Sequence, residues 1–149
     1  MLSAGIVDAF EGDLQRTVLL AFFVPGVVYL ADAVGTQTET LVIRGLSVGV
    51  SIGQVAVREL VTGLLVGVLL ALVVLPLAIV LWHDAAVAVA VALALLAACS
   101  IASVIAMALP WVFHRLGRDP AFGSGPLATV VQDLLSLVVY FAIARAALG

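Results

Sequence analysis

Two consecutive stretches of the chain contain no charged residue, one between Glu59 and Asp84 and the next between Asp84 and His114. Each is longer than the roughly 20 apolar residues that an α-helix needs to cross the hydrocarbon core of a bilayer. Charged residues make up 10% of the whole sequence, whereas they make up about a quarter of a typical soluble domain. These features predict a membrane protein and exclude a soluble globular domain.

Two further apolar stretches lie toward the ends of the chain. One begins at Thr17, and the other begins at Leu127 and contains a single carboxylate, Asp133. The predicted fold class is therefore all-α, a polytopic transmembrane helical bundle with four full spans, a short N-terminal segment and an amphipathic interfacial helix. The predicted spans cover about residues 17–34, 60–82, 85–109 and 126–146, and the amphipathic connection covers about 40–58.

The predicted amphipathic connection carries one polar stripe among Val, Ile, Leu and Gly residues. Its members recur at helical spacing: Arg44, Ser47, Ser51, Gln54 and Arg58. The uncharged part between the arginines is too short to span, which predicts a helix along the membrane interface. Gly63 and Gly67, one turn apart in the next span, predict a face for self-association, because small residues let helices approach closely.

The arginines predict the orientation of the spans. Arg44 and Arg58 lie in one connection, Arg115 and Arg118 lie in another, and the turn at Asp84 carries none. With four spans, both arginine-bearing connections fall on the same side, which the positive-inside rule assigns to the cytoplasm. We expect a multi-pass protein of the plasma or inner membrane with both termini outside, and no cleaved secretory signal.

The last predicted span carries a polar line on an apolar helix. Thr129, Asp133, Ser136 and Tyr140 recur at helical spacing, and Asp133 lies about 10 Å beyond Pro126 at a rise of 1.5 Å per residue. A carboxylate inside a membrane costs about 2.5 to 3.5 kcal/mol on insertion scales, so Asp133 should face a partner or a water-filled path. The last apolar stretch contains no Arg or Lys from Leu127 to Ala144, and the other three contain none either. We favour a cation-binding role, and a protonated Asp133 that is hydrogen-bonded between helices remains the alternative.

The first predicted span contains a second set of oxygen ligands. Pro25 and Gly26 are expected to interrupt the helix and to free backbone carbonyls, as happens where a backbone lines a cavity. Beyond them, Asp32, Thr36 and Glu39 recur at helical spacing. Carboxylates, hydroxyls and amides suit hard divalent cations such as Mg²⁺, which keeps much of its water and needs few direct ligands. The predicted metal ligands are Asp133, Asp32, Thr129, Thr36, Gln37 and Glu39.

Other functional classes find little support in the sequence. Six arginines without a lysine and a net charge of −3 argue against a nucleic-acid partner. Ser100 and Ser103 have no His or carboxylate in the same span that could act as a base, so we do not expect an enzyme. The lone cysteine, Cys99, lies among small residues and is predicted to be a packing residue.

Several ordered motifs resemble those of a known family. They are Phe23-Val24-Pro25, the run from Gly35 to Leu46, Arg58-Glu59-Leu60, Asp119-Pro120-Ala121, Ser124-Gly125-Pro126 and Asp133. Over roughly residues 11–148 the chain resembles the membrane domain of MgtE-type magnesium channels and their solute-carrier relatives. The resemblance implies transport of Mg²⁺ or a related divalent cation by a homodimer in membrane lipid, through a pore at the dimer axis lined by the first and last spans. It also implies that Asp133 is the pore carboxylate that recognises hydrated Mg²⁺.

The chain departs from the family pattern in three respects. Ala31-Asp32-Ala33 stands where the family usually has Gly-Gly-Asn, so Asp32 is expected to replace the Asn as an oxygen ligand. The family's first membrane helix and its cytosolic sensor domains have no counterpart, so we expect a single transmembrane domain over residues 1–149 without a cytosolic regulatory domain. The alternative to transport is a non-transporting membrane subunit whose polar stripes hold helices together or dock a partner protein.

Overall fold

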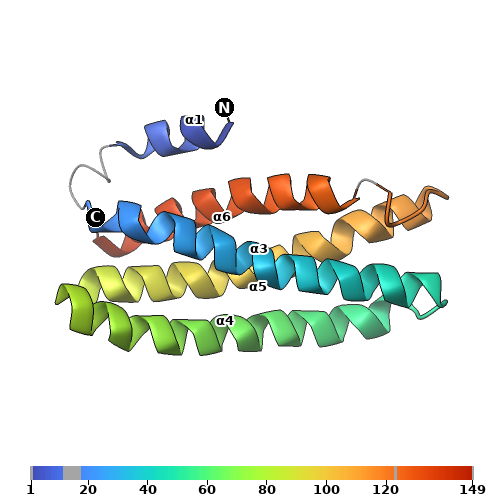
Figure 1. The fold of residues 1–149 in the computed structure, drawn as a ribbon, viewed down its shortest axis with the longest axis horizontal. Helices are drawn as coiled ribbons and strands as arrows, with labels where there is room; N and C mark the ends of the chain where they lie inside the picture. The colour runs from blue at the N-terminus through green and yellow to red at the C-terminus, as the bar shows by residue number, and fades with distance from the viewer. Residues whose placement is uncertain (1, 12–17, 123, 149) are drawn as a thin grey trace.

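The computed structural model describes residues 2–11, 18–122 and 124–148, and within them it contains helices and no strand. The helices are α1 (Leu2–Ala9), α3 (Leu19–Ser47), α4 (Ile52–Trp82), α5 (Ala85–Arg115) and α6 (Ser124–Leu148). The four long helices run back and forth side by side, and α1 lies against α6 (Figure 1). All four are long and apolar enough to cross a membrane. This confirms the predicted all-α bundle with four spans.

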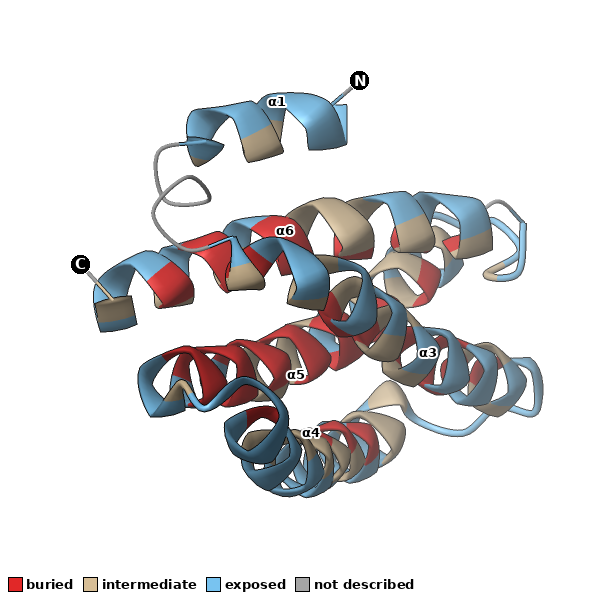
Figure 2. Cartoon of the chain, turned by 60° about the vertical axis from the view of Figure 1, so that its left-hand side comes forward, coloured by how far each residue is buried: buried red, intermediate tan, exposed pale blue. Residues whose placement is uncertain are grey.

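Helix α5 is the centre of the bundle because it packs against α3, α4 and α6 and because 56% of its most apolar part is buried, the largest share among the four spans. Its sequence is rich in alanine, whose small side chain lets other helices approach from several sides. Ala90, Ala94, Ala98 and Ala102 recur at helical spacing and are all at most 1% exposed. In Figure 2 the buried residues are concentrated along α5, whereas α4 shows mostly exposed residues. A helix without a charged residue before Arg115 thus organises the other three.

Helix α4 packs closely on α5 through two glycines. A Cβ atom at Gly63 would overlap the Ser103 side chain, and one at Gly67 would lie 3.2 Å from the Leu96 carbonyl oxygen and 3.3 Å from the Cys99 Cβ atom. Both glycines are buried inside the chain. The expectation that Gly63 and Gly67 form a self-association face is therefore wrong, because α5 already covers that face.

The connection between α3 and α4 is a short turn and not a helix along the interface. Helix α3 continues to Ser47, Gly49 adopts a positive φ of 77°, and α4 begins at Ile52. The predicted amphipathic helix over 40–58 is therefore wrong, and its polar stripe is divided between two spans. Both spans extend further toward this turn than the sequence predicts.

Burial of apolar side chains explains why the two helices continue to this turn. Val42 and Leu46 of α3 form a small core with Met107 of α5. Val55 and Ala56, in the first turns of α4, pack against the same core. A helix on the interface would leave these side chains partly in water, whereas the bundle removes them from it.

Helix α3 is continuous through Pro25, Gly26 and Gly35, so the predicted interruption at Pro25 and Gly26 is wrong. A proline inside a helix removes one backbone hydrogen bond, but it does not end a transmembrane helix whose two halves are held by neighbours. Val27 and Ala31, two and six residues after the proline, are 3% and 0% exposed. The predicted ligands on one unbroken helix are Asp32, Thr36, Gln37 and Glu39.

The turn between α4 and α5 lies at His83 and Asp84, where the sequence places it. His83 adopts a left-handed φ of 57°, and the Asp84 carboxylate caps α5 by accepting a hydrogen bond from the Val87 N–H at 3.0 Å. At its other end α5 runs to Arg115, beyond the predicted boundary at 109. The predicted start of the first span at residue 17 lies outside the described residues.

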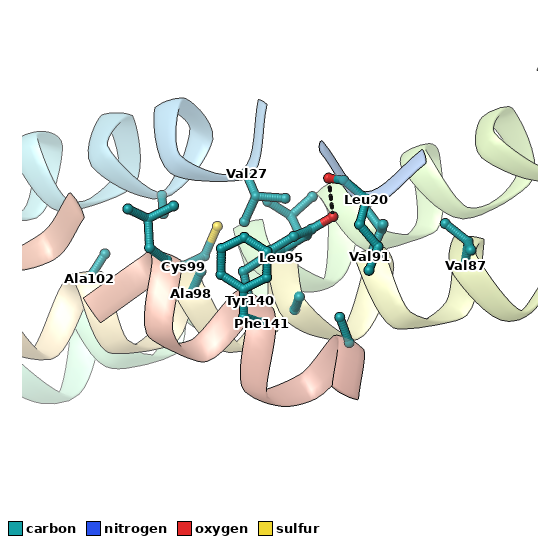
Figure 3. Close-up of a cluster of buried hydrophobic side chains, with 14 residues drawn as sticks. Leu20, Val27, Val87, Val91, Leu95, Ala98, Cys99, Ala102, Tyr140 and Phe141 are labelled. Carbon is teal, nitrogen blue, oxygen red and sulfur yellow. Dashed lines mark hydrogen bonds between the residues drawn. The ribbon is translucent and has the colours of Figure 1, made fainter. Parts of the chain in front are cut away.

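A large apolar cluster lies where α6 packs against the beginning of α3 (Figure 3). The Tyr140 hydroxyl donates a hydrogen bond to the Leu20 carbonyl at 2.7 Å, and both residues are 1% exposed. The Phe141 ring lies 5.3 Å from the Tyr140 ring and stacks on Phe10 at 5.0 Å between centroids. Tyr140, which the sequence places on the polar line of the last span, therefore joins α6 to α3.

Candidate functional site

Polar side chains gather where the second half of α3 meets the first half of α6. The helices approach closely because Gly35 has no side chain: a Cβ atom there would lie 2.6 Å from the Gln132 Cδ atom and overlap the amide. Gln132 is 2% exposed, and neither its Nε2 nor its Oε1 atom has a hydrogen-bond partner among the described residues. A buried amide without partners is costly, so this contact is a polar position inside the bundle that burial alone does not stabilise.

Asp32 of α3 and Asp133 of α6 belong to the same polar region. Both residues are half-buried, and both lie at the contact between Gly35 and Gln132, because Asp32 is one turn before Gly35 and Asp133 directly follows Gln132. The Asp32 Oδ1 atom is buried and has no hydrogen-bond partner in the described part of the chain. The basic residues of the two helices, Arg44 and Arg145, lie in the last turns, too far along the helices to neutralise this pair. Two carboxylates near each other in a medium of low dielectric constant attract a divalent cation.

Glu39 lies nearer the end of α3, beside the first turn of α6. It is 6% exposed, and a Cβ atom at Gly125 would lie 3.8 Å from its Oε1 atom, which has no hydrogen-bond partner within the described ranges. The N-terminus of a helix carries a partial positive charge that stabilises a nearby carboxylate. The Ser124 hydroxyl is engaged elsewhere, since it donates to the Pro120 carbonyl at 2.7 Å. Glu39 is thus a second acidic position, about 10 Å along α3 from Asp32 at 1.5 Å per residue.

The other predicted ligands differ in their exposure. Thr36 and Gln37 are exposed on α3, and Thr129 is half-buried on α6. No group of three or more His, Cys, Asp or Glu side chains converges in the part of the chain that the structure describes. The residues therefore suit the water shell of a hydrated ion better than a closed set of direct ligands.

Two residues with unpartnered buried atoms are not among the predicted ligands. Gln132 has a signal in the sequence, because an amide next to Asp133 in an apolar stretch is unusual, but only the fold places it against Gly35. Glu59 of α4 is 7% exposed, and its Oε2 atom has no hydrogen-bond partner among the described residues. Its signal in the sequence is its place as the last carboxylate before a long uncharged stretch.

Comparison with known proteins gives one consistent family. Residues 24–143 match the family model MgtE, described as a divalent cation transporter. The magnesium transporter MgtE of Bacillus subtilis is 35% identical over 150 residues, which cover 98% of this chain and 33% of that protein. The magnesium transporter MgtE of Thermus thermophilus is 31% identical over 151 residues, which cover 97% of this chain and 33% of that protein. The chain thus spans about a third of the length of the curated relatives it matches.

Proposed function

The chain belongs to the MgtE family of divalent cation transporters, and from this premise we propose that it moves Mg²⁺ or a similar divalent cation across a cell membrane. The relatives described above are named magnesium transporters, and the family consists of transporters and not of enzymes. Because the chain spans about a third of those relatives, the proposal also needs support from its own residues.

The observation that carries the proposal is the placement of two carboxylates, Asp32 and Asp133, on the two helices that meet where Gly35 contacts the unpartnered amide of Gln132. A single charge within a span costs about 2.5 to 3.5 kcal/mol, and two nearby like charges raise that cost. A divalent cation between them offsets both penalties. Since Mg²⁺ gives up water reluctantly, we expect it to pass with part of its water shell, whose O–H groups donate to carboxylate and amide oxygens.

The proposed path follows the facing parts of α3 and α6. Glu39 lies at the end of this path near the start of α6, and Asp32 and Asp133 lie deeper in the bundle. Together they supply charge at two depths, so that an ion leaving one position is attracted by the next. Neutral oxygens come from the three remaining predicted ligands, Thr36, Gln37 and Thr129.

A second copy of the chain would complete the path. Tyr29 is 73% exposed, and Thr36 and Gln37 are exposed on the same helix, which leaves a polar surface uncovered in the single chain. Lipid tails cannot hydrogen-bond with such side chains, which instead require protein or water. In a homodimer with α3 and α6 at its axis, two copies of Asp133 would face one ion.

The proposed orientation places the turn between α3 and α4 in the cytoplasm. Arg44, Arg58, Arg115 and Arg118 all lie toward this end of the bundle, and the positive-inside rule favours the cytoplasmic side for them. In the plasma or inner membrane, a cysteine placed beside Arg115 should be labelled only from the cytoplasm and one beside Asp84 only from outside. The reverse labelling pattern would overturn this orientation.

Ion flux into liposomes that contain only this purified chain tests the proposed function. We expect uptake of Mg²⁺, reported by an entrapped dye, to exceed that of protein-free liposomes, and competition with Co²⁺, Zn²⁺ and Ca²⁺ to rank the ions. No uptake by folded, correctly inserted protein would contradict transport and favour a non-transporting membrane subunit.

A further inference from the structure

We propose that Glu59 holds a second site for a hydrated divalent cation, in a cavity between α3 and α4 that is separate from the path along α3 and α6. The inference rests on the proposed function for the identity of the ion, but it does not require Asp133 to line a pore. It concerns a residue whose burial the transport path leaves unexplained.

The Glu59 carboxylate is buried without a hydrogen-bond partner for one of its oxygens, and a cation would stabilise it. The residue is 7% exposed, its Oε2 atom has no hydrogen-bond partner among the described residues, and the other buried residues of α4 are Gly63, Gly67 and Ala78. A carboxylate taken out of water without a partner is costly. Arg58 precedes it in the sequence, yet in the described part of the chain no ion pair joins the two side chains.

An open cavity of about 620 Å³ has Glu59 in its lining and has room for an ion with its water. Its lining includes Leu41 of α3 and Gln54, Arg58 and Glu59 of α4. Six waters in the octahedral shell of Mg²⁺, at about 30 Å³ each, would occupy roughly a third of this volume. The Gln54 amide adds a neutral oxygen that can accept hydrogen bonds from such waters.

The cavity is distinct from the acidic position on α3. Glu39 lies eight residues before the end of α3 and Glu59 lies seven residues after the start of α4, so the two are at similar depth beneath the turn. Glu39, however, lies beside Gly125 of α6, whereas Glu59 lines an open cavity formed mainly by α4 and bordered by Leu41 of α3. An ion at Glu59 would therefore sit beside the path and not within it.

Counting bound Mn²⁺ by electron paramagnetic resonance, with Mg²⁺ as competitor, tests the inference on the whole chain in nanodiscs. Glu59→Gln should remove one weak class of sites or weaken it about 10- to 100-fold, as the loss of an outer-shell ligand does. Asp119→Asn is the matched control, since it removes an exposed carboxylate at the same end of the bundle and keeps the oxygen that accepts from Ala121 at 2.9 Å. An unchanged Mn²⁺ count in folded Glu59→Gln protein would overturn the site.

Arg58→Gln provides a second test that does not alter the buried residue. Arg58 is exposed on the rim of the cavity, and removing its charge should tighten Mn²⁺ binding at this site about threefold, by Coulomb's law in a watery medium. Unchanged or weaker binding would count against a cation in this cavity.

Flux measurements separate this inference from the proposed function. If Glu59→Gln loses a Mn²⁺ site while the unaltered chain shows no flux, the result supports the cavity site and contradicts the proposed transport. If flux depends on Asp133 and Glu59→Gln still binds the full number of Mn²⁺ ions, the result supports transport and contradicts the cavity site.

Discussion

The outward sides of α3 and α4 differ in chemistry although both helices lie at the surface of the single chain. In the most apolar part of each helix, 22% of the residues of α3 and 11% of those of α4 are buried. The mean hydropathy of the same parts is 1.7 for α3 and 3.2 for α4. The exposed side chains of α4 are aliphatic and include Leu64, Leu65, Leu69, Leu72 and Val73.

The exposed side chains of α3 are suited to a different medium. They include Tyr29, Thr36, Gln37 and Thr40, and Thr40 satisfies its hydroxyl by donating to the Thr36 carbonyl at 2.9 Å. Exposure in an isolated membrane chain therefore does not identify the surroundings of a residue. The aliphatic side of α4 fits lipid tails, whereas the polar side of α3 fits water or another protein surface.

The strongest test of the polar region that α3 forms with α6 is Asp133→Asn. Asn keeps the shape and hydrogen-bonding atoms of Asp but removes the charge that would attract the ion. Flux of Mg²⁺ into liposomes should fall by about 100-fold, equivalent to about 2.7 kcal/mol, while folding stays intact. Asp119→Asn, which removes an exposed carboxylate, should leave flux unchanged. Full flux in folded Asp133→Asn protein would remove Asp133 from the path.

An arginine placed on each outward side compares the two media directly. Leu69 is 62% exposed near the middle of α4, and Leu69→Arg should destabilise the inserted protein by about 2.5 to 3.5 kcal/mol if lipid covers that side. Thr36→Arg on α3 should cost clearly less stability, because its surroundings are already polar, and should instead block flux by repelling cations. Equal losses of stability, measured by unfolding in nanodiscs, would show that both sides face lipid.

The inner side of α4 is tested by a larger residue at Gly63. Gly63→Leu would force its side chain into Ser103, and overpacking of this kind costs about 1 to 3 kcal/mol. Since Gly63 packs inside the chain, crosslinking should show an unchanged oligomeric state in the protein that still folds. Gly53→Leu is the control, because a Cβ atom at Gly53 would meet nothing within 4 Å.

The smallest expected effect concerns the apolar half of the contact between α3 and α6. Tyr140→Phe removes the hydrogen bond to the Leu20 carbonyl and should cost about 1 kcal/mol of stability. It should leave Mg²⁺ flux nearly unchanged, because Tyr140 lies outside the polar region around Asp32, Gln132 and Asp133. Tyr29→Phe, at a tyrosine that is 73% exposed, should leave stability unchanged, and a flux defect in Tyr140→Phe would extend the path into the apolar half.

Patterns in the sequence predicted the polar region better than the connections. Asp32 and Asp133 stand out because carboxylates are rare in apolar stretches, and the fold places both at the contact between α3 and α6 where Gly35 meets Gln132. The spacing of polar residues over 40–58 is equally regular, but a short turn divides it between two helices. A helical period shows which residues share a face only if the helix is continuous, and continuity there depends on packing against Met107 of α5.

The sequence by itself determined the number of spans, because the length of an uncharged apolar stretch is a local property and the bilayer requires about 20 such residues. It also determined that carboxylates would lie within the first and last spans. Only the tertiary structure decided that Gly63 meets Ser103, that Gly35 meets Gln132, and that Glu59 is buried. These contacts join residues far apart in the chain, so they depend on which helix faces meet, and no local pattern carries that information.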